Sequence, residues 1–201
     1  MNSAELLERS LAYALGSVAA VVPGSLGRAT PCAQWDLGDL LCHLDDSVDA
    51  LYEGVASGSI GLRPGQDAVD PVCAFRERAG ALLGAWAVAA GEPPRDGVAV
   101  AVGGRALELG LLAAVGAVEI AVHGWDVAQA SGRPRPLPPS LAADLFPVAR
   151  CIVADADRGV RFAEPVGVPA RACPGDRLVA FLGRRPGPPR FLSGTASVCL
   201  S

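Results

Sequence analysis

The sequence predicts one mostly α-helical domain, a four-helix bundle with a small β-hairpin and a short C-terminal helix. Apolar residues recur three and four positions apart over several long segments, and Gly- and Pro-rich stretches separate these segments. A single short segment has the pattern of a hairpin. A chain of 201 residues, 51% hydrophobic and 19% charged, can bury a substantial core, which excludes disorder as its main state.

The first two helices are predicted at residues 3–22 and from Asp36 onward. Asn2 and Glu5 fit a capping box at the first helix, and Asp36 with Asp39 caps the second. Each helix carries an apolar stripe at helical spacing: Leu7, Leu11, Leu15, Val18 and Val22 in the first, and Leu37, Leu40, Leu41, Leu44, Val48, Leu51 and Val55 in the second.

A loop is expected at 58–66, before a third helix over 70–90 that has proline at its first position. Residues 98–109 predict the hairpin, because Gly103 and Gly104 suit a tight turn between two short apolar strands.

The fourth helix is predicted at 109–131 and is apolar almost all round, which is typical of the centre of a bundle. A fifth helix is expected at 140–157, then an irregular stretch, then a last helix at 174–184. We therefore expect one domain over 1–185 and a tail over 186–201.

Composition excludes several classes of function. The net charge of −4 argues against a nucleic-acid partner, and the absence of lysine excludes Schiff-base lysine chemistry and P-loops. The apolar part of the uncharged stretch 10–27 is too short to span a bilayer. Glu5 and Glu8 offset Arg9, which disfavours the alternative of a signal peptide, so we expect a cytoplasmic protein without a membrane partner.

Six cysteines show no CxxC pair and no tight spacing: Cys32, Cys42, Cys73, Cys151, Cys173 and Cys199. We expect them to be reduced and mostly buried, without a disulfide framework or a zinc site of their own.

The residues that carry chemistry stand on the fourth helix. Glu119, His123 and Asp126 share one face, and a carboxylate inside a bundle needs compensation. An ion pair between Glu119 and His123 is one solution. A metal is another, because His43, the only other histidine, would complete a His2Glu set if the second and fourth helices are neighbours. Zinc is the first choice, with nickel, iron or manganese as alternatives.

Other polar and aromatic residues have simpler interpretations. Asp36 and Asp39 suit helix caps, and Trp35, Trp86 and Trp125 suit packing in the core or at its rim.

Three separated motifs resemble one family. They are TPCAQWDLGDLLCHL at 30–44, EIAVHGWDVAQASGRP at 119–134 and DRLVAFLGR at 176–184. The chain is similar to the DinB-like metal-binding superfamily, and more narrowly to the actinobacterial branch typified by the N-terminal domain of mycothiol-dependent maleylpyruvate isomerase. The resemblance implies a four-helix bundle with a metal on His43, Glu119 and His123. The isomerases carry an additional C-terminal domain where this chain has only its tail, so maleylpyruvate is not assigned as substrate.

The leading hypothesis is a metal-dependent enzyme that activates a low-molecular-weight thiol such as mycothiol. The thiolate would add to a small electrophilic substrate, in transfer or isomerisation. Glu119 is the anionic ligand, and Asp126 or Asp39 would orient a ligand histidine. The alternatives are a metal-dependent hydrolase, a Lewis-acid lyase or cyclase without a thiol, and a non-catalytic metal-stabilised binding protein. Monomer and homodimer both stay open.

Overall fold

The structure is a computed structural model, and it describes residues 3–32, 35–61, 68–91 and 99–187. It divides into two compact units, residues 1–135 and 136–201, each of which is taken by itself below.

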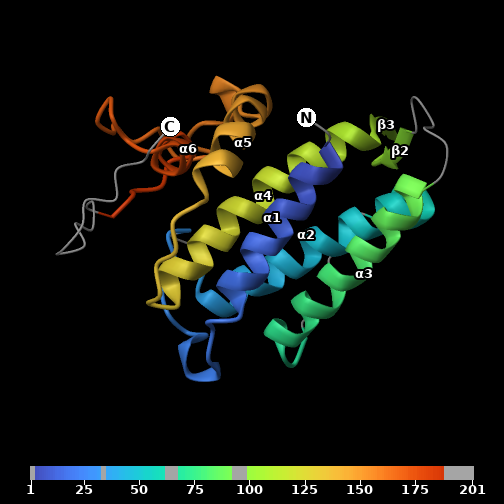
Figure 1. The fold of residues 1–201 in the computed structure, drawn as a ribbon, viewed down its shortest axis with the longest axis horizontal. Coiled ribbons are helices and arrows are strands. Elements are labelled where there is room, and N and C mark those ends of the chain that lie inside the picture. Colours follow the sequence, from blue (N-terminus) through green and yellow to red (C-terminus); the bar gives the residue numbers. More distant parts are fainter. Residues whose placement is uncertain (1–2, 33–34, 62–67, 92–98, 188–201) are drawn as a thin grey trace. The chain divides into compact units, whose positions relative to one another are not determined.

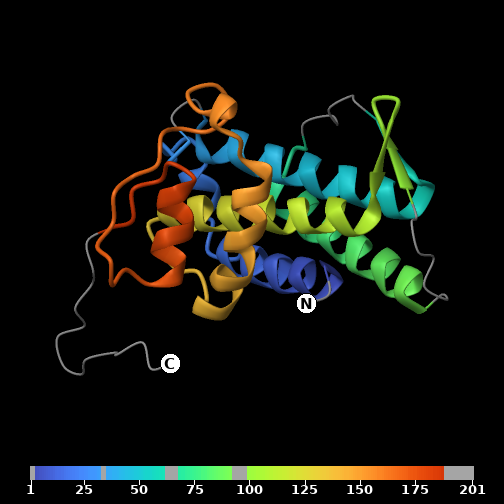
Figure 2. The ribbon, with the colours of Figure 1, turned by 90° about the horizontal axis from the view of Figure 1, so that it is seen from above.

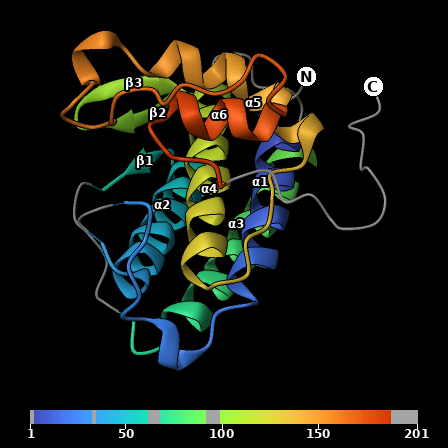
Figure 3. The same cartoon turned by 90° about the vertical axis from the view of Figure 1, so that its left-hand side faces the viewer.

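The first unit is a bundle of four long helices that run side by side (Figures 1 and 2). α4 packs against both α1 and α2, and it lies between them in Figure 3. This confirms the predicted mostly α-helical bundle. The helices are α1 (Ser3–Val18), α2 (Leu37–Ser57), α3 (Pro71–Gly91) and α4 (Leu109–Ala130).

Glycines let the neighbours of α4 approach its backbone closely. A Cβ atom added at Gly124 would lie 2.9 Å from Cα of Ala14 on α1, and one added at Gly116 would lie 2.6 Å from the Leu51 side chain on α2. Among the described residues α4 is the one helix long and apolar enough to cross a membrane, and 72% of that apolar stretch is buried within the protein. A long, apolar and mostly buried helix is typical of the centre of a bundle, which is where the sequence placed the fourth helix.

A three-stranded sheet sits at the end of the bundle where α4 begins (Figure 2). The predicted hairpin is confirmed as β2 (Ala99–Val102) paired antiparallel with β3 (Arg105–Glu108). Its turn needs φ values of 55° and 79° at Gly103 and Gly104, which glycine adopts without strain. The short strand β1 (Ser59–Ile60) pairs parallel with β2, in a segment for which the sequence predicted only a loop.

Local side chains cap the start of two helices, and the capping box predicted for the second helix is present. At α2, Oδ1 of Asp36 accepts a hydrogen bond from the backbone N–H of Asp39 at 2.9 Å, and Oδ2 of Asp39 accepts one from the N–H of Asp36 at 3.2 Å. At α3, Oδ1 of Asp70 accepts from two backbone N–H groups. The Asn2 cap predicted for α1 lies outside the described residues.

Two helices end four or more residues earlier than predicted. α1 ends at Val18 rather than at residue 22, because the N–H groups of Ala20 and Val21 bond to carbonyl groups three residues back. Pro23 then holds Val22 in extended backbone (φ −118°, ψ 148°). In the second unit, α5 (Pro139–Ile152) ends five residues before the predicted 157, where a carboxylate oxygen of Asp157 accepts a hydrogen bond from the N–H of Ala154 and opens a separate short turn.

The second unit joins α5 to α6 (Pro174–Phe181), which ends slightly before the predicted 184. Phe146 and Phe181 pack edge to face with ring centres 5.5 Å apart. The guanidinium of Arg158 lies over the Phe181 ring and donates to the Phe181 carbonyl at 2.9 Å. Most of the predicted tail, residues 188–201, lies outside the described part of the chain, and the predicted boundary at 185 stays a prediction.

Candidate metal centre

The structure brings together the three side chains that the sequence singled out for a metal. His43 comes from α2, and Glu119 and His123 come from α4 one turn apart. Oε1 of Glu119 lies 2.8 Å from Nε2 of His43 and 3.1 Å from Nε2 of His123. The two imidazole rings stand almost perpendicular, with centres 5.0 Å apart. The second and fourth helices are therefore neighbours, the condition on which the His2Glu set depended, and their contact brings both histidines to one carboxylate oxygen.

One side of this cluster is open to solvent and the other is buried. The side chains of His43 and Glu119 are 33% and 38% exposed, whereas that of His123 is only 8% exposed. A ligand could therefore reach the cluster from the side of His43 and Glu119 without any helix moving.

The three groups are electrostatically coupled. Burial raises the pKa of Glu119, but hydrogen bonds and positive charge from His123 and His43 outweigh burial and hold that pKa well below its ordinary value. Burial lowers the pKa of His123, but its hydrogen bonds, to Asp126 first and then to its other polar neighbours, raise that pKa well above its ordinary value. The cluster without a metal is therefore a carboxylate held by at least one imidazolium.

Asp126 fixes the orientation of His123. Its side chain is fully buried, and its Oδ2 lies 3.0 Å from Nδ1 of His123. A proton held on Nδ1 by this carboxylate leaves Nε2, the nitrogen that faces Glu119, available as a metal ligand. This is the contact that the predicted orienting role of Asp126 requires.

Asp39, the other carboxylate predicted to orient a histidine, lies elsewhere. It is exposed, and its carboxylate belongs to the capping box of α2. Among the described residues no hydrogen bond joins it to either histidine, and the cap accounts for its presence.

Two residues at the centre were missed as site residues, and both lie in the segment before α2. Sγ of Cys32 lies 3.4 Å from Oδ2 of Asp126, to which it donates, and 3.9 Å from Nδ1 of His123. The Trp35 ring packs on the His43 ring with centres 4.5 Å apart. Their place in the first family motif, TPCAQW, was the signal that could have identified them.

The other cysteines need one correction. No disulfide joins the five described cysteines, as predicted, and Cys199 lies outside the described residues. The expectation that most are buried is wrong, because Cys73 and Cys151 are exposed and the other three are half-buried. Both exposed residues lie on outward faces of their helices, where a side chain as small as cysteine contributes little to packing.

The donor set fits a divalent metal such as zinc. Two imidazole nitrogens and one carboxylate oxygen lie within 4.8 Å of one another. Ligands about 2.05 Å from a tetrahedral zinc lie about 3.3 Å apart, so separations of 2.8 and 3.1 Å need only a small outward shift. Three protein donors with an exposed side leave at least one position for a further ligand, as in catalytic zinc sites.

Comparison with known proteins agrees with the family resemblance. The family model described as mycothiol maleylpyruvate isomerase N-terminal domain matches residues 7–128. Two uncharacterized proteins of Mycobacterium tuberculosis, MT0763 of strain CDC 1551 / Oshkosh and Rv0738 of strain ATCC 25618 / H37Rv, are each 29% identical to this chain over 171 residues, which is 79% of this chain and 85% of the relative. Both are mycobacterial, in line with the predicted actinobacterial branch. No solved structure matches the chain significantly.

Proposed function

The chain belongs to the mycothiol maleylpyruvate isomerase N-terminal domain family, a mycothiol-related family of DinB-like metal-binding domains, and on this basis we propose that it is a metal-dependent enzyme acting with a low-molecular-weight thiol. The proposed reaction is addition of the thiolate to a small electrophilic substrate, followed by transfer or by elimination in an isomerisation.

The observation that carries the proposal is the convergence of His43, Glu119 and His123 at a half-exposed position. A closed structural site would need no approach from solvent, whereas here two of the three donors face it. A bound divalent metal would lower the pKa of a coordinated thiol and so supply a nucleophile at neutral pH.

Each residue of the cluster has a separate task in this proposal. Glu119 supplies the one negative charge among the three donors. Asp126 holds the Nδ1 proton of His123, and the Trp35 ring supports the His43 ring from one side. Both histidines are therefore held by neighbours before any ligand arrives.

We propose zinc as the metal, with nickel, iron or manganese as alternatives, and mycothiol as the co-substrate. The proposed setting is the cytoplasm, with a small-molecule substrate and neither a nucleic acid nor a membrane as partner. The acidic net charge of −4 supports the exclusion of nucleic acid. Monomer and homodimer remain the two proposed states.

The test uses the protein loaded with Co2+, whose absorption spectrum reports its ligands. Mycothiol should produce a thiolate-to-cobalt charge-transfer band in the near ultraviolet, and S-methylated mycothiol should not. The His43→Ala variant should lose both the metal and the band. A cobalt spectrum that saturating mycothiol leaves unchanged would contradict the thiol proposal, and a wild-type protein that retains no metal after dialysis would contradict the metal site.

A further inference from the structure

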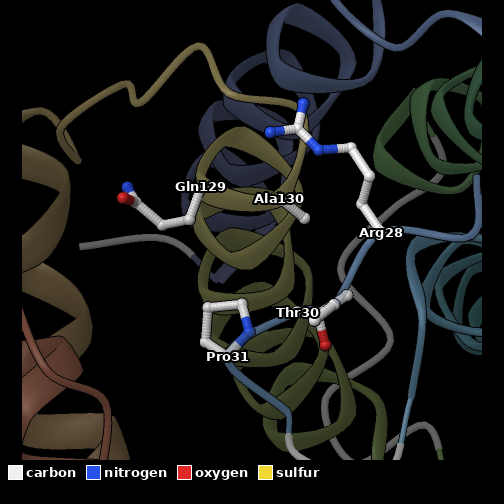
Figure 4. A pocket seen from close by; sticks show the side chains of 6 residues that line it. Arg28, Thr30, Pro31, Gln129 and Ala130 are labelled. Atoms are coloured by element: carbon white, nitrogen blue, oxygen red, sulfur yellow. The ribbon is translucent and has the colours of Figure 1, made fainter. Parts of the chain in front are cut away.

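An open depression of about 460 Å3 lies on the first unit, outside the metal centre. Two segments form it, the stretch before Cys32 and the last turn of α4, and Figure 4 shows their side chains around it. None of the three proposed metal donors lines it. The lining residues are Arg28, Ala29, Thr30, Pro31, Gln129 and Ala130.

The depression lies close to the metal centre along the chain. Thr30 and Pro31 directly precede Cys32, whose thiol contacts Asp126. Gln129 follows Asp126 by one turn of α4. Because α4 rises about 1.5 Å per residue, Gln129 lies about 9 Å along the helix from His123. The depression and the metal centre therefore lie near each other along α4.

Arg28 is the cation of the depression, and its guanidinium lies beside Gly132 at the end of α4. Its side chain reaches the C-terminal turn of α4 (Figure 4), where the helix carbonyl groups favour a positive charge. Nη1 of Arg28 lies only 2.9 Å from the point that a Cβ atom on Gly132 would occupy. Gly132, with φ of 75°, thus leaves the space that the guanidinium fills.

The guanidinium keeps its hydrogen-bonding capacity. Arg28 is exposed, and no ion pair or side-chain hydrogen bond engages it among the described residues. By contrast, the Thr30 hydroxyl is already used, because it lies 2.8 Å from the Trp35 carbonyl and 3.1 Å from the Cys32 N–H. Arg28 and the Gln129 amide are therefore the side chains that could bind a polar group.

The rest of the lining is apolar, since Ala29, Pro31 and Ala130 contribute no side-chain donor or acceptor. A guanidinium offers paired N–H groups that match a carboxylate in geometry. One cation balances a singly charged carboxylate, whereas a doubly charged phosphate would call for more positive charge than Arg28 provides.

We propose that this depression is a subsite for a small molecule that has one carboxylate and an apolar body, with the carboxylate on Arg28. The binding itself does not depend on the metal centre. In the enzyme proposed above, the subsite would hold the carboxylate of the substrate, and this role rests on the proposed function.

Benzoate and benzamide are the probes for the test, because they have nearly the same shape and differ in charge. Each is titrated into the metal-free and the zinc-loaded wild-type protein, and amide and side-chain NMR signals are followed. Benzoate should shift the signals of Arg28, Gln129 and Ala130 in both forms. Its dissociation constant should be lower than that of benzamide by about 5-fold, the upper range for an exposed ion pair.

Variants then assign the charge. Arg28→Gln should raise the benzoate dissociation constant by about 5-fold and leave benzamide unchanged, and Arg28→Lys should restore part of the difference. Arg76→Gln, which removes the same charge from the exposed surface of α3, should change neither. Equal binding of both probes, or unchanged benzoate binding in Arg28→Gln with an intact spectrum, would overturn the subsite. Shifts that occur only with zinc would overturn it too, because they would place benzoate on the metal.

Discussion

Replacing Glu119 by Gln tests whether this side chain binds a metal or only pairs with two histidines. Gln is nearly the same size as Glu, so the packing of α4 should survive. If Glu119 is the anionic ligand, the change removes the one negative charge among the three donors, which balances half of the charge of a divalent ion. We expect metal affinity to fall by about 10- to 100-fold, as for altered metal shells.

The contacts in the structure set the expected cost in stability. Oε1 of Glu119 meets two imidazole nitrogens, at 2.8 and 3.1 Å, and the side chain is 38% exposed. Hydrogen bonds to charged groups contribute about 1.5–3 kcal/mol each when buried, and solvent screening at a partly exposed position reduces this. We expect the free energy of unfolding of metal-free Glu119→Gln to be lower than that of the wild type by about 1–3 kcal/mol. Each kcal/mol should lower the melting temperature by about 2–4 °C.

The assay is metal analysis and thermal melting of wild type and Glu119→Gln side by side, with Glu8→Gln on the exposed face of α1 as the control. Loss of metal with a modest drop in melting temperature supports a catalytic metal on a self-sufficient bundle. Equal metal content in the wild type and the Glu119→Gln variant would refute the reasoning, whatever the melting temperatures.

Three further predictions address the surroundings of the centre. Asp126→Asn should weaken metal binding by about 10- to 100-fold in a chelator competition, because the amide no longer holds the Nδ1 proton of His123 as a carboxylate does; unchanged affinity would exclude the orienting role. The raised pKa of His123 stabilises the metal-free fold below the unfolded value of 6.5, and this stabilisation is lost as pH rises through the folded value. The melting temperature of the metal-free protein should thus fall as pH rises, whereas the increase in melting temperature on adding zinc should become larger. Melting temperatures with and without zinc that change with pH in parallel would contradict this. Gly124→Ala should cost about 1–3 kcal/mol by denaturant titration, because its Cβ would press on Ala14. Gly80→Ala on open α3 surface should instead gain about 0.5–1 kcal/mol, and equal effects would refute the packing argument.

Periodicity and caps predicted the long helices well, because those signals are local. The capping box of Asp36 and Asp39 and the Gly103-Gly104 turn formed as expected. The failures are of a different kind. β1 has two residues and exists only by pairing with β2, which is far away in the sequence. The apolar pattern of the first helix continues to Val22, but Pro23 holds Val22 in extended backbone and the helix ends at Val18.

The ligand set could be predicted because the choice was small. The chain has two histidines, and helical spacing places Glu119 and His123 on one face. Cys32 and Trp35 were harder to place at the centre. They lie in an irregular segment whose path over α4 follows from tertiary packing, and no spacing rule reports that path.

That segment is closed on itself, and this has a mechanical consequence. An isolated antiparallel β-bridge joins the backbone of Ala29 to that of Asp36. The Thr30 hydroxyl donates a hydrogen bond to the Trp35 carbonyl across the loop. Thr30 and Pro31 therefore line the depression, while Trp35 of the same loop lies against His43. A ligand that displaced Thr30 would have to break its hydrogen bond to the Trp35 carbonyl, so the closed loop resists such a displacement.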